Sequence, residues 1–188
     1  RVIYPSKSSQ YFHALRMQAN ETENITPMII MTPKSLLRHP FAASSVDEFV
    51  EKEFSKVLTY QSKNKDNCEL LVLCSGKIIV DLLDENNNPK NQNCSIISIE
   101  ELYPFPFKEI ESFITKNKNI KKIIWIQEEP KNRGAWQFVS NQINKSSILN
   151  DLELEYYGST ERASTSVGTS ELHKIQIEAI TTKFNELK

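Results

Sequence analysis

The residues best suited to chemistry stand where an apolar run ends. Residues 123–126 are β-branched or aromatic without interruption, and Gln127, Glu128 and Glu129 follow them at once. Such a run is typical of a strand that is buried on both faces of a sheet. Two neighbouring carboxylates are candidates for a general acid and a general base. Successive residues of a strand point to opposite faces, however, so we do not expect Glu128 and Glu129 to act together on one substrate.

The residues after the carboxylates indicate how the chain must position them. Pro130 removes a backbone donor and disfavours helix at Glu129, so the strand is predicted to end there, and Gly134 allows a helix to begin at Ala135. The carboxyl ends of strands border the ligand crevice in open α/β sheets. One carboxylate would either pair with an arginine at 133 or 162 or cap a helix across the crevice. We predict a structural or interface role at this crevice for Gln127, Glu128, Glu129, Trp136 and Arg162.

Two basic segments are candidates for anion binding. Lys34, Arg38 and His39 fall within two helical turns after an apolar strand, where they would either hold an anion or face solvent. The turn Ser75-Gly76-Lys77 resembles half of a phosphate loop, because a small turn before a helix offers backbone donors. The rest of that glycine-rich signature is absent, so a tight strand-to-helix turn is the alternative. The predicted anion-binding residues are Lys34, Arg38 and Lys77.

Composition limits the class of protein. The 188 residues have a formal net charge of −1 and are 39% hydrophobic, which is enough for one core with a flanking element. Basic and acidic residues are mixed, so neither a nucleic acid nor a membrane is expected as a partner. No apolar run reaches the roughly 18 residues of a membrane helix. No metal site is expected, because no metal-ligand spacing links Cys68, Cys74, Cys94, His13, His39 and His173. The three cysteines should therefore be free and buried thiols.

The order of apolar and amphipathic segments predicts the fold. A strand at 1–5, a helix at 9–19 and a strand at 27–31 form a crossover unit, which implies a parallel pair. A small, polar stretch at 41–47 marks a domain boundary, which divides the chain into 1–44 and 45–188. Beyond it, strands at 69–74, 94–99, 121–127 and 152–157 alternate with helices at 77–85, 107–115, 135–144 and 170–187, which predicts a layered α/β domain. The last helix should face inward with Leu172, Ile175, Ile177, Ile180 and Phe184.

Several blocks of sequence resemble one known family. They are Gln10-Tyr11-Phe12-His13, residues 32–40, Cys74-Ser75-Gly76-Lys77, residues 101–106, and Gln127-Glu128-Glu129-Pro130 with Asn132, Gly134, Ala135 and Trp136. In this order they resemble the carboxyl-terminal end of the first, decarboxylating component of the 2-oxoglutarate dehydrogenase complex. The likeness covers nearly the whole chain.

The resemblance implies both a fold and an activity. Residues 1–44 would close a pyrimidine-binding domain, and residues 45–188 would form a transketolase-like C-terminal domain. That domain is a three-layer α/β/α sandwich with a mainly parallel five-stranded sheet and one antiparallel edge strand, here at 54–59. The implied enzyme of the tricarboxylic acid cycle uses thiamine diphosphate and magnesium to decarboxylate 2-oxoglutarate.

The resemblance also implies partners and a location. The enzyme would be a homodimer that passes the succinyl group to lipoyl groups on a succinyltransferase core, in the bacterial cytoplasm or the mitochondrial matrix. The family's cofactor motifs and catalytic histidines lie upstream of Arg1. No catalytic, cofactor-binding or metal residue is therefore predicted here, no cofactor is expected on these residues, and they should be inactive alone.

Two roles of different class remain for the chain itself. The first is a structural domain that holds the dimer. The second is a regulatory module that binds an anion or an acyl-CoA through Lys34, Arg38 and Lys77, since some relatives bind an acyl-CoA activator in this region. Arg38 suits a phosphate because a guanidinium group presents a fork of donors. Relatives often have a second arginine where this chain has Met17.

Overall fold

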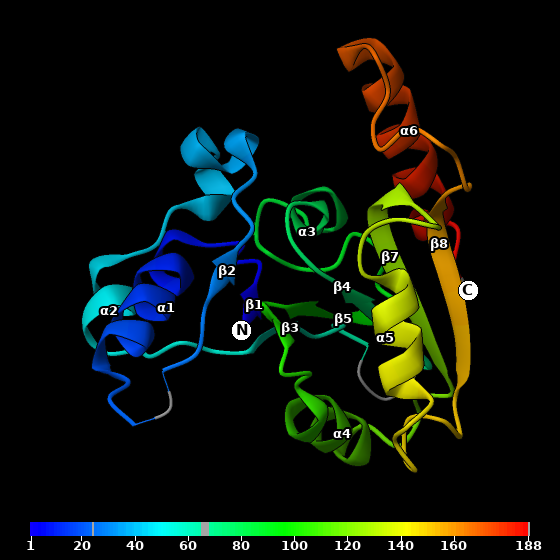
Figure 1. Cartoon of the computed structure of the whole chain (residues 1–188). Coiled ribbons are helices and arrows are strands. Elements are labelled where there is room, and N and C mark those ends of the chain that lie inside the picture. The colour runs from blue at the N-terminus through cyan, green and yellow to red at the C-terminus, as the bar shows by residue number, and fades with distance from the viewer. Residues whose placement is uncertain (24, 65–67, 188) are drawn as a thin grey trace.

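The main sheet has five strands in the order β3-β5-β4-β7-β8. The computed structural model in Figure 1 describes residues 1–23, 25–64 and 68–187. β3 pairs with β5 antiparallel, and all other neighbours in this sheet are parallel. The predicted parallel sheet with one antiparallel edge strand is therefore confirmed. The strands are β3 Val57–Tyr60, β4 Leu70–Cys74, β5 Cys94–Ile99, β7 Lys122–Pro130 and β8 Glu153–Ser159.

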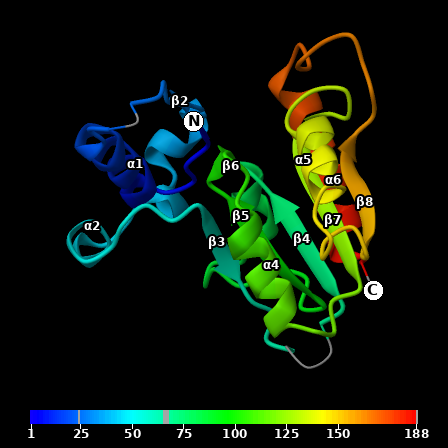
Figure 2. The same cartoon turned by 60° about the horizontal axis from the view of Figure 1, so that its bottom comes forward.

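Helices cover both faces of this sheet, as Figures 1 and 2 show. α4 (Phe107–Lys116) and α5 (Trp136–Ile143) lie on one face, and α3 (Ile78–Leu82) and α6 (Ser170–Asn185) lie on the other. Alternate residues of β4 and β7 enter two separate apolar cores, as the period of a strand requires. One core holds Leu71, Leu73, Trp125, Ile110 and Val139, and the other holds Val72, Cys74, Ile124, Ile78 and Phe184. The three-layer α/β/α sandwich is confirmed.

A second, smaller sheet has the order β2-β1-β6. β1 (Val2–Ile3) and β2 (Ile29–Ile30) are parallel and are joined by α1 (Ser8–Asn20), so the predicted crossover unit is confirmed. β6 (Glu101–Tyr103) follows β5 and pairs with β1 antiparallel. β6 was not predicted, because it has only three residues and is followed at once by Pro104. A strand pair thus joins residues 1–44 to residues 45–188, and the division between them stays a prediction.

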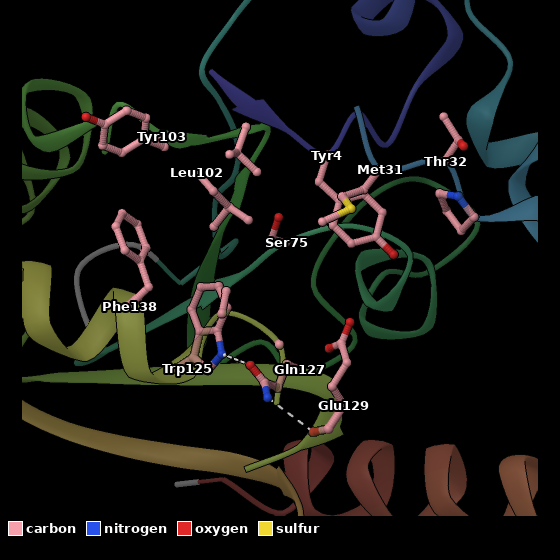
Figure 3. A pocket seen from close by; sticks show the side chains of 14 residues that line it. Tyr4, Met31, Thr32, Ser75, Leu102, Tyr103, Trp125, Gln127, Glu129 and Phe138 are labelled. Carbon is pink, nitrogen blue, oxygen red and sulfur yellow. Dashed lines mark hydrogen bonds between the residues drawn. The ribbon is translucent and has the colours of Figure 1, made fainter. Parts of the chain in front are cut away.

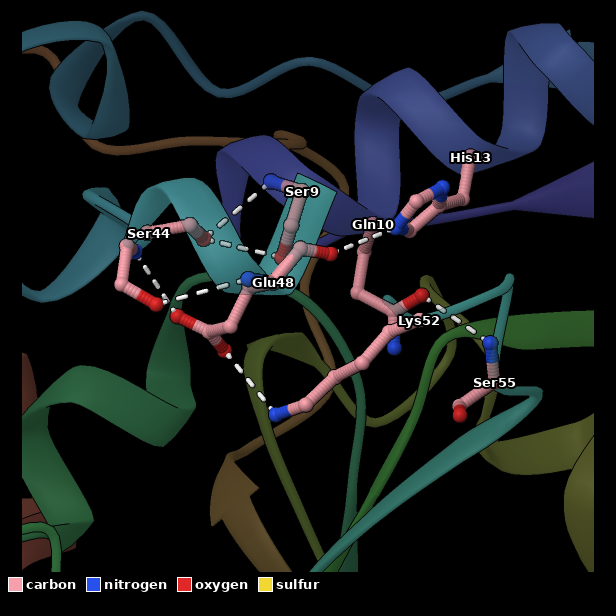
Figure 4. A network of polar contacts seen from close by, with 8 residues as sticks. Ser9, Gln10, His13, Ser44, Glu48, Lys52 and Ser55 are labelled. Carbon is pink, nitrogen blue, oxygen red and sulfur yellow. Dashed lines mark hydrogen bonds and ion pairs between the residues drawn. The ribbon is translucent and has the colours of Figure 1, made fainter. Parts of the chain in front are cut away.

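Polar contacts also join α1 to the start of the following segment (Figure 4). The Ser44 hydroxyl donates to Ser9 Oγ at 2.9 Å and accepts from Ser9 N at 3.2 Å. His13 Nε2 donates to the carbonyl oxygen of Glu48 at 2.7 Å. Glu48 lies in α2 (Val46–Val50), which begins with a capping box between Ser45 and Glu48. His13 is therefore a packed helix residue, as predicted, and it is 2% exposed.

The inward face of α6 was predicted only in part. Ile180 and Phe184 are buried, and Ile177 is partly buried, but Leu172 and Ile175 are 50% and 54% exposed. The prediction for these last two residues was wrong because the first half of α6 extends past the sheet and has no layer to pack on (Figure 1). Among the helices of the described residues, none combines the length and the apolar character needed to cross a bilayer.

Candidate functional site

A cavity lies at the carboxyl ends of β4 and β7 (Figure 3). β5 and β7 flank β4 on opposite sides, so the chain winds in opposite directions from β4. Open α/β sheets bind ligands at such a topological switch point. The cavity has a volume of about 720 Å³. We name it the switch-point cavity, and its lining includes Tyr4, Met31, Ser75, Tyr103, Glu129 and Phe138.

Gln127 ties the end of β7 to the start of α5. Its side chain is 2% exposed, and its Oε1 accepts from Trp125 Nε1 at 2.8 Å and from the backbone N of Trp136 at 3.0 Å. Its Nε2 donates to the carbonyl oxygen of Arg133 at 2.8 Å and to two more carbonyl oxygens of the turn at 3.2 Å. Every hydrogen-bonding atom of the amide is therefore engaged, which holds the turn in one conformation.

Glu128 faces α3 and α6, where Lys77 and His173 lie beside it. Lys77 Nζ lies 2.7 Å from Glu128 Oε1, and His173 Nε2 lies 3.9 Å from it. Lys77 also pairs with Asp81 at 3.4 Å. Burial lowers the pKa of Lys77, but the hydrogen bond and charge of Glu128, with Asp81, outweigh burial and raise this pKa. Lys77 is thus engaged by two carboxylates.

Glu129 faces the switch-point cavity on the opposite side of the sheet, as the alternation of a strand predicts. Burial raises the pKa of its carboxyl group, and the nearby charge of Glu128 raises it further. Among the described residues, no Lys, Arg or His forms an ion pair with this carboxylate. The two neighbouring glutamates therefore have different environments, one paired and one unpaired.

Neither arginine considered as a partner for these carboxylates forms an ion pair with them among the described residues. Arg133 Nη2 donates to the carbonyl oxygen of Ala163 at 3.3 Å. The backbone N of Arg162 donates to Asn132 Oδ1 at 3.2 Å, and Asn132 Nδ2 returns a bond to Arg162 O at 3.1 Å. The option of an arginine–carboxylate pair was wrong, because Glu128 pairs with Lys77 and Glu129 faces the cavity. Trp136 packs on Tyr156 of β8, with ring centroids 5.3 Å apart.

The turn Ser75-Gly76-Lys77 is filled by Tyr4. Gly76 has a φ of +75°, and a Cβ there would overlap the Tyr4 ring. The space above the turn that an anion would need is therefore taken by the ring. Burial, helped by the charges of Glu129 and Glu128, raises the pKa of Tyr4 to about 12. The turn matches the alternative reading, a tight connection from strand to helix.

A second cavity of about 760 Å³ lies between the start of α1 and the short 3-10 helix Lys34–Arg38. We name it the basic cavity, because its lining includes Lys7, Arg38 and His39 and no Asp or Glu among the described residues. The predicted trio is not brought together here, since Lys34 and Lys77 are absent from this lining. Lys7 was missed because a lysine before a helix gives no signal of its own.

Two buried carboxylates that no sequence pattern indicated join residues 1–44 to residues 45–188. Glu100 is 0% exposed and accepts hydrogen bonds from Ser6 N at 2.7 Å, Ser6 Oγ at 2.7 Å and Ser98 Oγ at 2.9 Å. Burial raises the pKa of Glu100 to about 7 despite these bonds. Glu101 is also 0% exposed and pairs with Arg1 Nη1 at 2.8 Å. No pattern in the sequence separates these two glutamates from exposed ones.

The potential metal ligands in the part of the chain that the structure describes are its His, Cys, Asp and Glu side chains. Within residues 1–23, 25–64 and 68–187, no group of three or more His, Cys, Asp or Glu side chains is placed to hold one. The cysteines are free and buried, which confirms that part of the prediction: Cys68, Cys74 and Cys94.

Comparison with known proteins assigns a family. The protein-family model described as "2-oxoglutarate dehydrogenase C-terminal" matches residues 43–184 of the chain. Proteins named "2-oxoglutarate dehydrogenase E1 component" are similar to the chain: 39% identical over 180 residues in Geobacillus sp. (strain WCH70) and 41% over 175 in Exiguobacterium sp. (strain ATCC BAA-1283 / AT1b). Staphylococcus aureus (strain JH9) has one that is 38% identical over 176 residues.

The alignments cover 90% to 93% of this chain but only 18% to 19% of the relatives, so the chain spans about a fifth of their length. The resemblance read from the sequence blocks is confirmed, and the chain belongs to the 2-oxoglutarate dehydrogenase C-terminal family.

Proposed function

We propose that the chain is the carboxyl-terminal part of a 2-oxoglutarate dehydrogenase that decarboxylates 2-oxoglutarate and passes the succinyl group to lipoyl groups. The observation that carries this proposal is the 38% to 41% identity with proteins of that name across at least 90% of the chain. The enzyme would use thiamine diphosphate, which stabilises the carbanion left when an oxo acid loses carbon dioxide. Among the described residues, no group of three or more His, Cys, Asp or Glu side chains is placed to hold the magnesium, so no step of the reaction is assigned to them.

The role proposed for these residues is structural. Three contacts hold residues 1–44 against residues 45–188: Glu100 with Ser6, Glu101 with Arg1, and the Tyr4 ring on Gly76. Buried charge pairs and hydrogen bonds of this kind fix one arrangement, because separating them leaves a buried charge without a partner. We call these three contacts the joint between residues 1–44 and residues 45–188. We propose that the joint supports the formation of a homodimer, which transfers the succinyl group to a lipoyl-bearing succinyltransferase core. The bacterial relatives support a bacterial cytoplasm as its location.

Activity measurements test this function. The natural polypeptide that carries these residues should reduce ferricyanide in the presence of 2-oxoglutarate, thiamine diphosphate and magnesium, and it should be far slower with pyruvate. The 188 residues alone should show no turnover. Absence of turnover by the natural polypeptide would contradict the proposed reaction, and turnover by the 188 residues alone would contradict the structural role.

The second candidate is an anion or acyl-CoA-binding regulatory module. The observation that favours it is the basic cavity, where Lys7, Arg38 and His39 converge beside the first turn of α1. The amino-terminal end of a helix attracts anions, and a guanidinium group pairs with phosphate. Lys77 no longer belongs to this candidate, because Glu128 and Asp81 engage it.

A thermal-shift measurement with acetyl-CoA or a nucleotide tests this candidate. A ligand present at about one hundred times its Kd adds about 2.7 kcal/mol to the free energy of unfolding. The Arg38→Gln variant should lose most of the shift. Lys34→Gln is the matched control, since Lys34 belongs to the same 3-10 helix but does not line the cavity. No shift at millimolar ligand would remove this candidate.

A further inference from the structure

The switch-point cavity has an uneven chemistry. Aromatic side chains form much of its wall, contributed by Tyr4, Tyr103, Trp125 and Phe138. Glu129 is the one charged residue of its lining, and no Lys, Arg or His is present among the described residues that line it. A volume of about 720 Å³ lies within the usual range for small-molecule pockets. The cavity is therefore large enough for a ligand, and its walls select against an anion.

The backbone that carries Glu129 is held in place, whereas no ion pair among the described residues neutralises its carboxylate. The carbonyl oxygen of Glu129 accepts from Gln127 Nε2 at 3.2 Å and from the Tyr156 hydroxyl at 3.1 Å. These bonds fix the carbonyl group of Glu129. Figure 3 shows the carboxyl group directed toward the Tyr4 ring, above the amide of Gln127. A partly buried carboxylate without a counter-charge is costly, and a cation in the cavity would relieve that cost.

We propose that the switch-point cavity binds an alkylammonium or alkylguanidinium group, with its charge on Glu129 and its apolar stem against the aromatic wall. Cations bind favourably to the faces of aromatic rings, and the partly exposed ring of Tyr4 stands on the same cavity as the carboxylate. The apolar stem gains by leaving water. The proposal concerns binding and does not depend on the reaction proposed above.

The same chemistry has two possible sources. One is a free amine or guanidine, and the other is the side chain of a lysine or arginine carried by another polypeptide segment. Both present a positive charge at the end of a flexible apolar stem. The probes below separate these sources.

Calorimetric titration of the natural polypeptide tests the proposal. The probes are n-pentylammonium and n-pentylguanidinium, with 1-pentanol as the neutral match and pentanoate as the anionic match. The cations should bind about tenfold more tightly than 1-pentanol, a difference of about 1.4 kcal/mol, and pentanoate should not bind. An acetylated, amidated peptide with one lysine between glycines reports on the side-chain source, and n-pentylammonium reports on the free amine.

Variants assign the binding to this cavity. Glu129→Gln should remove the preference for a cation over 1-pentanol, while Glu171→Gln, an exposed glutamate on α6, should keep it. Met31 is 45% exposed on the wall, so Met31→Trp should fill the cavity and abolish binding of every probe without unfolding the protein. The proposal is overturned if no cation binds at millimolar concentration, if 1-pentanol or pentanoate binds as tightly as the cations, or if Glu129→Gln keeps the preference.

Discussion

The switch-point cavity and the basic cavity share one wall, Met31 to Pro33, yet they carry opposite charge. The ends of β4 and β7 bring Glu129 to one side of this wall. The start of α1 and a 3-10 helix bring Lys7 and Arg38 to the other side. The difference shows how the secondary structure beside a cavity influences the charge of the ligand that it favours. The amino-terminal end of a helix favours anions through its backbone, whereas the end of a strand contributes only its side chains.

The most disruptive test of this comparison removes the support beneath the switch-point cavity. Gln127→Ala leaves the Trp125 indole, the backbone N of Trp136 and the carbonyl oxygen of Arg133 without their partner, while the carbonyl oxygens of Glu129 and Pro130 keep their bonds from the Tyr156 hydroxyl and from Arg133 N. Each buried group left unpaired costs on the order of 1–3 kcal/mol, so we expect a loss of about 4 kcal/mol in the free energy of unfolding by urea.

Gln137→Ala is the control for this variant. Gln137 is exposed on α5, so its replacement should change stability by less than about 0.5 kcal/mol. Equal losses in the two variants would show that the amide of Gln127 does not organise the turn. Thermal shifts caused by ligands of the basic cavity should persist in both variants.

A pH series tests the joint on which both cavities rest. Burial raises the pKa of Glu100 from 4.5 to about 7, so the folded protein holds this proton to higher pH than the unfolded chain does. This contribution to stability is complete below about pH 4.5 and is lost as the pH rises through 7. The free energy of unfolding should fall by about 3 kcal/mol over this interval.

Glu100→Gln should remove most of that pH dependence. A glutamine accepts from Ser6 N and donates to the hydroxyl groups of Ser6 and Ser98, so it replaces the protonated acid in the same network. An unchanged slope of stability against pH in this variant would assign the effect to other groups.

A smaller loss of stability is expected when the Tyr4 ring, which lines the switch-point cavity, is displaced. Gly76→Ala places a side chain at a φ of +75° and displaces the Tyr4 ring. We expect a loss of about 2 kcal/mol, since a left-handed conformation alone costs 1–2 kcal/mol. Gly168→Ala is the matched control, because no atom lies within 4 Å of its added Cβ. Equal midpoints of thermal unfolding would contradict the close contact between Tyr4 and the turn.

The smallest expected change in stability comes from removing one charge from each cavity, that of Glu129 or that of Arg38. The pKa of Glu129 is raised by burial, so its ionisation costs stability as the pH rises. Glu129→Gln should therefore raise the free energy of unfolding at neutral pH by less than about 1 kcal/mol, and the gain should vanish in acid. Arg38→Gln should change stability by less than about 0.5 kcal/mol at either pH. A loss of stability in Glu129→Gln would show that its charge is already compensated.

The sheet could be predicted because its strands are long and apolar. Residues 70–74 and 122–126 are buried on both faces, so composition and length alone mark them. β6 could not be predicted in this way, since three residues carry no period and its pairing partner lies about a hundred residues away. The exposed positions of Leu172 and Ile175 show a second limit, because periodicity describes a helix and not the layer it packs on.

The two cavities could not be predicted from the sequence for a related reason. Five separate segments meet at the switch-point cavity, and the residues that give it character, Tyr4 and Glu129, are 125 positions apart. Lys77 was predicted to bind an anion but is paired with Glu128. The parallel pairing of β4 with β7 brings that lysine and that glutamate together, and no local pattern encodes the contact.

The chain has two tryptophans, and both donate to the same oxygen of Gln127, Trp125 through its indole and Trp136 through its backbone. The Trp125 indole is 1% exposed and bonded to Gln127, so its ultraviolet emission is a gauge of this corner. Water entering the corner will shift that emission toward longer wavelength. The protein carries its own optical probe of the place where strand becomes helix.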